Sequence, residues 1–289
     1  MRPKVGSELL PWLHHRVILH GRQTGNGRTK EQAVDLTPMR GKVRILQLEI
    51  TYRCNLLCNH CNRHCNLTFL PYLKDADMTE EQIDRFIRQV KENSVHLDQI
   101  RILGGEPLLH PKIENFLFKL HRELMMDGLL DTIVLVTNGI LSRQERLATF
   151  LNDTTIKPLL ESGRISFQVA WEGKEHEFRG VLIAPVDMGM PWQECGVTRA
   201  CGSLLNAYGY WPNGNCAAIA RLFYMPHYAK REFPVIFEEN WPTLGNDLCR
   251  FCVKGSSILI RNKSDRVTKS YREAFERWRN GFRGKFARY

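Results

Sequence analysis

Three cysteines, Cys54, Cys58 and Cys61, follow an apolar run with the spacing C-x3-C-x2-C. Thiolates grouped this tightly bind zinc or the iron of an iron-sulfur cluster. Both kinds of site normally take four ligands, so three thiolates leave one position on the metal open for another molecule. In the alternative interpretation, a closed zinc site, the fourth ligand is Cys65, His60 or His64.

A second set of four cysteines lies in the C-terminal part of the chain: Cys201, Cys216, Cys249 and Cys252. Four thiolates can close a structural zinc shell or hold an iron-sulfur cube, and both interpretations fit this set. The chain has nine cysteines, an odd number, and proline and charged residues interrupt its N-terminal stretch where a secretory signal would be apolar. We therefore expect metal or redox chemistry rather than disulfides, in a cytoplasmic protein.

Strand and helix patterns alternate from residue 43 to about residue 190. Apolar, β-branched runs predict strands within residues 43–51, 97–107, 131–139, 164–173 and 179–189. Helical periodicity predicts helices within residues 78–93, 113–128 and 142–152. A capping box of Thr79 and Gln82 opens the first of these helices. Such repeats predict an α/β fold with a parallel sheet, in which ligand chemistry collects at the carboxyl ends of the strands.

Three motifs at those carboxyl ends resemble the radical SAM enzymes. They are Glu49–Asn55 (EITYRCN) with the three cysteines, Gly104–Pro107 (GGEP) and Thr137–Gly139 (TNG). The resemblance implies a truncated partial (β/α) barrel and a [4Fe-4S] cluster held by the three cysteines. It also implies that the open iron binds S-adenosylmethionine, whose reductive cleavage gives a 5'-deoxyadenosyl radical that abstracts hydrogen from the substrate.

The resemblance further implies which residues contact the cofactor. Gly104 and Gly105 would let the backbone approach the methionine ammonium group. The other expected contacts are Tyr52, His60, Glu106, Pro107, Thr137 and Asn138. The chain departs from the family pattern at His60, where a larger aromatic residue is common, and at Ala170–Gly173, where many relatives have a Ser-Leu-Asp-Gly-like stretch.

For the second cysteine set, the resemblance is to the twitch subdomain, a short form of the SPASM domain that holds one auxiliary [4Fe-4S] cluster. Cys195 is a further candidate ligand beside the four cysteines named above. The expected division is an N-terminal extension (1–42), the radical SAM partial barrel (43–190), the SPASM/twitch-like subdomain (191–260) and a C-terminal basic helix (261–289).

A fully ligated auxiliary cluster can only accept or relay electrons, which favours oxidation of a substrate radical. Epimerisation needs a hydrogen donor instead, and Cys65 and Cys195 are candidates for that role. His176 or Glu172 could accept the proton that leaves when an alcohol is oxidised. Further candidates for substrate contact are Lys174, Arg179, Tyr210 and Trp211.

The formal net charge of +10 favours an anionic partner. We expect a small sugar, cyclitol or nucleotide-type substrate, an electron donor such as flavodoxin or ferredoxin, and no membrane partner. One alternative is a radical SAM peptide maturase that forms thioethers or epimerises a ribosomal peptide. Another is a zinc-stabilised protein that binds nucleic acid, which is disfavoured because aromatic residues are not interleaved with basic ones.

Overall fold

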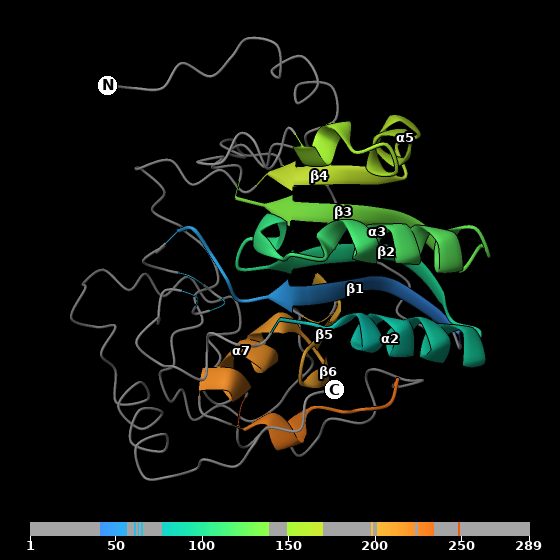
Figure 1. The fold of residues 1–289 in the computed structure, drawn as a ribbon. Helices are drawn as coiled ribbons and strands as arrows, with labels where there is room; N and C mark the ends of the chain where they lie inside the picture. Colours follow the sequence, from blue (N-terminus) through green and yellow to red (C-terminus); the bar gives the residue numbers. More distant parts are fainter. Residues whose placement is uncertain are drawn as a thin grey trace, which may run out of the picture.

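The computed structural model describes residues 41–56, 61, 63, 65, 77–138, 149–169, 198, 201–222, 225–233 and 248. Within these residues the chain forms an α/β fold around one sheet (Figure 1). The expected strand at 179–189, the C-terminal basic helix and nearly all of the N-terminal extension lie outside the described residues. Among the residues described, no helix is both long and apolar enough to cross a membrane.

Within the described part of the chain, the sheet has six strands in the order β4-β3-β2-β1-β5-β6. Their bounds are β1 Lys42–Thr51, β2 His96–Gly104, β3 Leu130–Thr137, β4 Ile165–Val169, β5 Ser203–Asn206 and β6 Gly209–Trp211. Neighbouring strands from β4 to β5 pair in parallel, and only β6 runs antiparallel to its neighbour. The first four predicted strands and the α/β class with a parallel sheet are therefore confirmed.

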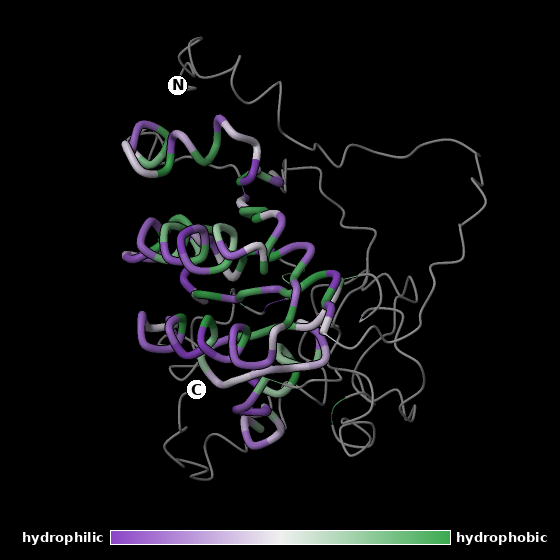
Figure 2. The backbone as a smooth tube through the Cα atoms, turned by 90° about the vertical axis from the view of Figure 1, so that its right-hand side faces the viewer, coloured by the Kyte–Doolittle hydropathy of each residue, from purple (hydrophilic) through white to green (hydrophobic). Residues whose placement is uncertain are grey.

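The helices are α2 Glu80–Glu92, α3 Ile113–Leu120, α5 Ile156–Glu161 and α7 Gly214–Leu222. The predicted capping box opens α2, and α3 runs on into the π-helical turn η3, His121–Met125. Helix α5 was not predicted, since six residues are too few to show a helical period. Figures 1 and 2 show α2, α3 and α5 on one face of the sheet, and Figure 2 shows the alternation of polar and apolar residues in these helices.

Strand β1 lies inside the sheet, between β2 and β5, and is buried on both faces. Leu46, Leu48 and Ile50 point to one face and are fully buried in the hydrophobic core. Successive side chains of a strand alternate between faces, so Gln47 and Glu49 point the other way, yet both are also buried. A buried carboxylate needs hydrogen-bonding or charged partners. The partners of Glu49 lie beneath the loop after β1 that carries Cys54, which we call the cysteine loop.

Strands β5 and β6 fall inside the segment that the sequence assigns to a separate twitch-like subdomain. In the structure β5 pairs with β1 from Leu46 to Glu49, and thereby extends the sheet. The two strands are joined by a tight hairpin, and α7 follows directly. The subdomain boundary at residue 190 stays a prediction, but these two strands are hydrogen-bonded into the same sheet as the barrel strands.

Candidate metal and cofactor site

The loops after β1, β2 and β3 meet at one edge of the sheet, as parallel pairing requires. The backbone N–H of Gly105 donates to the Thr51 carbonyl oxygen at 2.8 Å. The N–H of Glu106 donates to the Arg53 carbonyl oxygen at 2.7 Å. These bonds hold the GGEP stretch directly against the start of the cysteine loop.

The two glycines of this stretch are required by that close approach. A Cβ atom at Gly104 would overlap the Thr51 carbonyl oxygen. A Cβ at Gly105 would overlap the Arg53 carbonyl oxygen and lie 3.0 Å from the Cβ of Cys54. The sequence predicted that the glycines make room for a cofactor. Within the described residues, the atoms that occupy this space belong to the end of β1 and to the start of the loop that carries Cys54.

Glu106 is buried and its carboxylate binds the loop after β3. It accepts hydrogen bonds from the N–H of Leu108 at 3.2 Å, the hydroxyl of Thr137 at 2.9 Å and the N–H of Asn138 at 2.8 Å. Burial raises the pKa of Glu106, although these three donors favour its charged form. Glu106 and Thr137 are thus bonded to each other, and their contact with a cofactor stays a prediction.

Hydrogen-bond donors surround the sulfur atoms of both described cysteines of the first motif. The Leu56 N–H lies 3.5 Å and the Asn138 side-chain nitrogen 4.0 Å from Cys54 Sγ, and the Cys65 N–H lies 3.4 Å from Cys61 Sγ. Burial raises the pKa of Cys54, whereas a hydrogen bond from the Cys65 thiol lowers that of Cys61 to about 6. Donors of this kind stabilise thiolates, so the residues fit a thiolate-bound metal.

Beneath the cysteine loop lies a buried polar group that we call the Glu49 cluster: Glu49, Tyr52, Arg63, Asn206 and Arg221. The Tyr52 hydroxyl donates to Glu49 and accepts from the Asn206 side chain at 2.9 Å. Arg63 Nε lies 3.3 Å from a Glu49 carboxylate oxygen. The Arg221 guanidinium lies 3.4 Å from the centre of the Tyr52 ring and donates to the Arg63 carbonyl oxygen.

Tyr52 therefore supports the loop from within this cluster, and its predicted contact with the cofactor stays a prediction. Its hydroxyl is already paired, and burial together with Glu49 raises its pKa well above the ordinary value. Sequence reasoning missed the roles of Arg63, Asn206 and Arg221. Glu49, a carboxylate between Leu48 and Ile50 in the buried half of the strand, was the one local signal that a buried cation must come from elsewhere.

Two members of the second cysteine set are described, on either side of the β5–β6 hairpin. Cys201 lies two residues before β5, and its carbonyl oxygen accepts from Gln47 at 2.6 Å. Cys216 is buried in the first turn of α7, where its N–H is capped by the Asn213 side chain at 3.0 Å. Cys249, Cys252 and Cys195 lie outside the described residues, so the assembly of this set stays a prediction.

The remaining candidates divide into two groups. Tyr210 and Trp211 are fully buried, and their polar atoms bond to Gln89 at 2.8 Å and Asn206 at 3.0 Å. They are core residues, so the hypothesis of substrate contact is wrong for these two. The candidates that lie outside the described residues are Cys58, His60, Glu172, Lys174, His176 and Arg179.

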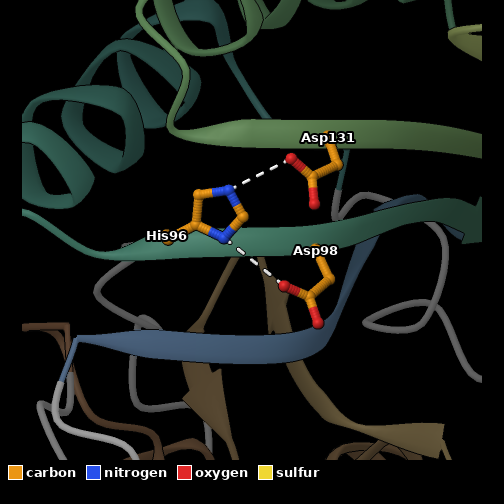
Figure 3. A group of neighbouring side chains, drawn as sticks. All are labelled: His96, Asp98 and Asp131. Carbon is orange, nitrogen blue, oxygen red and sulfur yellow. Dashed lines mark hydrogen bonds and ion pairs between the residues drawn. The ribbon is translucent and has the colours of Figure 1, made fainter.

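A separate group of possible metal ligands, His96, Asp98 and Asp131, lies at the opposite edge of the sheet (Figure 3). The imidazole stands between the carboxylates, with Nε2 3.1 Å from Asp131 and Nδ1 3.4 Å from Asp98. Lys42 Nζ also lies 3.0 Å from Asp98. The two carboxylates face different ring nitrogens, and a lysine already neutralises one of them. This geometry is that of an ion-pair group rather than a metal site.

Residues 48–179 match the family model described as the Radical SAM superfamily. The GTP 3',8-cyclases of Brucella ovis and Brucella canis are each 34% identical to this chain over 122 residues, which is 42% of this chain and 33% of theirs. The chain thus spans about a third of the length of these curated relatives.

Two solved structures resemble the chain weakly. SuiB of Streptococcus suis bound to the precursor peptide SuiA matches 40% of this chain and 23% of its own, at 22% identity and a TM-score of 0.28. BtrN in complex with AdoMet and 2-DOIA matches 76% of this chain and 96% of its own, at 11% identity and a TM-score of 0.44. Likenesses this weak carry no argument about function. The cysteine motif and the glycine pair packed against it lie within residues 48–179, the segment that matches the radical SAM superfamily model.

Proposed function

We propose that the protein is a radical SAM enzyme whose Cys54, Cys58 and Cys61 hold a [4Fe-4S] cluster. When bound, the cluster and S-adenosylmethionine would supply a 5'-deoxyadenosyl radical for hydrogen abstraction. The observation that carries this proposal is the set of N–H donors around Cys54 and Cys61, next to the GGEP backbone. Sulfur atoms that accept such bonds are suited to bind iron as thiolates.

The chain's own residues would prepare this site in two ways. Glu106 fixes the loop after β3, so that the Asn138 side chain faces Asn55 and Cys54. Gly105 lets the backbone after β2 pack against Cys54 without a side chain between them. The proposed cofactor contacts stay Tyr52, His60, Gly104, Gly105, Glu106, Pro107, Thr137 and Asn138. Pro107 is buried at the start of the short turn Pro107–Leu109.

We propose a small anionic substrate of the sugar, cyclitol or nucleotide type. The formal net charge of +10 supports an anionic ligand, and the Brucella relatives are named for a reaction of the nucleotide GTP. Dehydrogenation would use His176 or Glu172 to accept a proton. Epimerisation would use a thiol as hydrogen donor; the buried Cys65, whose pKa is raised because its thiol donates to Cys61, would keep its S–H.

We further propose that Cys201, Cys216, Cys249 and Cys252 hold an auxiliary [4Fe-4S] cluster that accepts or relays an electron. The positions of Cys201 and Cys216 at the two ends of one hairpin support this assignment. A cytoplasmic location and a flavodoxin or ferredoxin as electron donor belong to the same proposal. The peptide maturase remains the alternative reaction class within it.

The test is the iron and sulfide content of anaerobically reconstituted protein, with visible and EPR spectra. Two four-iron cubes predict about eight iron per chain in the parent. Changing Cys54, Cys58 and Cys61 to alanine should leave about four iron, and changing Cys201 and Cys216 should also leave about four. Dithionite-reduced parent should release 5'-deoxyadenosine from S-adenosylmethionine, whereas the first variant should not. Zinc without iron would overturn the proposal and leave the nucleic-acid-binding alternative.

A further inference from the structure

Arg221, in the last turn of α7, connects this helix with the cysteine loop. It is 3% exposed, and its guanidinium is stacked on Tyr52 and bonded to the Arg63 carbonyl oxygen. Arg63 in turn packs its guanidinium against Gly214 at the start of α7, where a Cβ atom would overlap it. Both ends of α7 therefore contact residue 63, which lies two positions from Cys61.

The Glu49 cluster carries more positive than negative charge. Glu49 is its one carboxylate, and Arg63 lies against it at 3.3 Å. Arg221 is the second cation, and among the described residues its Nε and Nη1 atoms are buried without a hydrogen-bond partner. A buried, uncompensated cation is costly in free energy, so an anion is expected nearby.

The thiol groups of the cysteine loop are within electrostatic reach of this cation. Arg221 donates to the Arg63 carbonyl oxygen, and the Cys65 thiol lies 3.9 Å from the same oxygen. The Cys65 N–H lies 3.4 Å from Cys61 Sγ. A four-iron cluster held by three thiolates is an anion, and its reduction adds one further negative charge. The negative charge of such a cluster would therefore balance the buried positive charge of Arg221.

We propose that Arg221 raises the reduction potential of the cluster held by Cys54, Cys58 and Cys61, while Glu49 lowers it. This inference rests on the proposed function. A nearby cation stabilises the reduced, more negative cluster more than the oxidised one, and a carboxylate does the opposite. Because Arg221 and Cys216 share helix α7, the helix that would carry a ligand of the auxiliary cluster also tunes the first one.

The experiment is an EPR-monitored redox titration in which Cys249 and Cys252 are changed to alanine, so that only the first cluster contributes. Arg221→Met should shift the midpoint to a more negative potential, and Arg221→Lys should restore part of the shift. Glu49→Gln, which is nearly isosteric, should shift the midpoint to a more positive potential. Arg122→Met is the control for overall charge, because Arg122 is exposed and bonds to its neighbour Glu123, and it should leave the midpoint unchanged.

A merely structural role for Arg221 would reduce the amount of cluster but leave the midpoint of the remaining cluster where it is in the parent. An unchanged midpoint in Arg221→Met would overturn the inference. If Arg221→Met holds no cluster, Glu49→Gln decides, and an unchanged midpoint there would overturn it equally. A parent without iron would overturn the proposed function itself, whereas a parent with a normal cluster and unresponsive variants would overturn only this inference.

Discussion

At the scale of single residues, the site depends on the absence of a side chain at Gly105 as well as on the carboxylate of Glu106. Gly105 has no side chain, and this lets two loops meet at Cys54. Glu106 beside it offers a carboxylate that three donors occupy. The GGEP stretch thus holds the cysteine loop in place before any cofactor binds.

We predict that Gly105→Ala lowers the free energy of unfolding by about 1–3 kcal/mol, because a Cβ would be forced into backbone atoms. Iron bound per folded chain should fall as well, since the loop of Cys54 must move. Urea titration and iron analysis measure the two effects. Gly128→Ala is the control: its φ of +69° strains the backbone, but no atom lies within 4 Å of the new Cβ. It should cost stability and leave iron binding intact; equal iron loss in both variants would contradict this prediction.

The two described thiols of the first motif should differ in reactivity when the protein is metal-free. The pKa of Cys61 is lowered to about 6, so its thiolate predominates above that pH, whereas the pKa of Cys54 is raised and its thiol stays protonated near neutrality. Alkylation by iodoacetamide, followed by peptide mass spectrometry over a pH series, should modify Cys61 at lower pH than Cys54. Cys65→Ala should move the Cys61 profile to higher pH, because the thiol donor is lost. Identical profiles for Cys61 and Cys54 would refute the assignment.

At the scale of elements, the first turn of α2 is capped by its own side chains and is also hydrogen-bonded to the β5–β6 hairpin. Thr79 and Gln82 cap each other, with Gln82 N to Thr79 Oγ1 at 3.3 Å and Thr79 N to Gln82 Oε1 at 2.8 Å. The same Gln82 side chain donates to the Ala207 carbonyl oxygen at 3.1 Å. Gln82 thus helps to cap α2 and also attaches the β5–β6 hairpin to this helix.

Removal of the cap hydroxyl tests the first of these roles. Thr79→Ala should destabilise the protein by about 1 kcal/mol, the usual cost of losing a capping hydroxyl. Thr79→Ser keeps the acceptor and should stay close to the parent. Chemical denaturation followed by circular dichroism gives both values, and equal stabilities for the two variants would show that the hydroxyl contributes nothing.

At the scale of the whole molecule, the sheet is completed by strands that come late in the chain. β5 covers the edge of β1, and Leu204 and Leu205 are fully buried there. Asn206 follows them and reaches the hydroxyl of Tyr52. The cysteine loop consequently rests on residues from both β1 and β5.

A fragment that ends at residue 190, the predicted end of the barrel, should therefore not fold. It lacks β5, so β1 would expose an open edge, and the Glu49 carboxylate would lose Asn206. We expect aggregation on size-exclusion chromatography and no cooperative thermal transition, whereas the 289-residue chain should be monodisperse and unfold cooperatively. A soluble fragment with cooperative unfolding would instead establish residues 43–190 as an independent domain.

The sequence by itself determined the features that depend on local pattern. The spacing of Cys54, Cys58 and Cys61 predicts a metal-binding loop, and strand and helix periodicity predicted the four strands β1 to β4 and the α/β class. The capping box of α2 was also visible, because both partners lie within one helical turn. Parallel pairing then follows from the alternation of strands and helices, and it brings the three motifs to one edge.

Only the tertiary structure decided what lies beneath that loop. Glu49 meets Asn206, 157 positions later, and the Arg63 carbonyl meets Arg221, 158 positions later. No local pattern encodes such pairs, because they depend on where β5 and α7 pack after the sheet has formed. Tyr210 and Trp211 illustrate the same limit. Their residue types suggested contact with a substrate, but both side chains are buried in the core and bonded to Gln89 and Asn206.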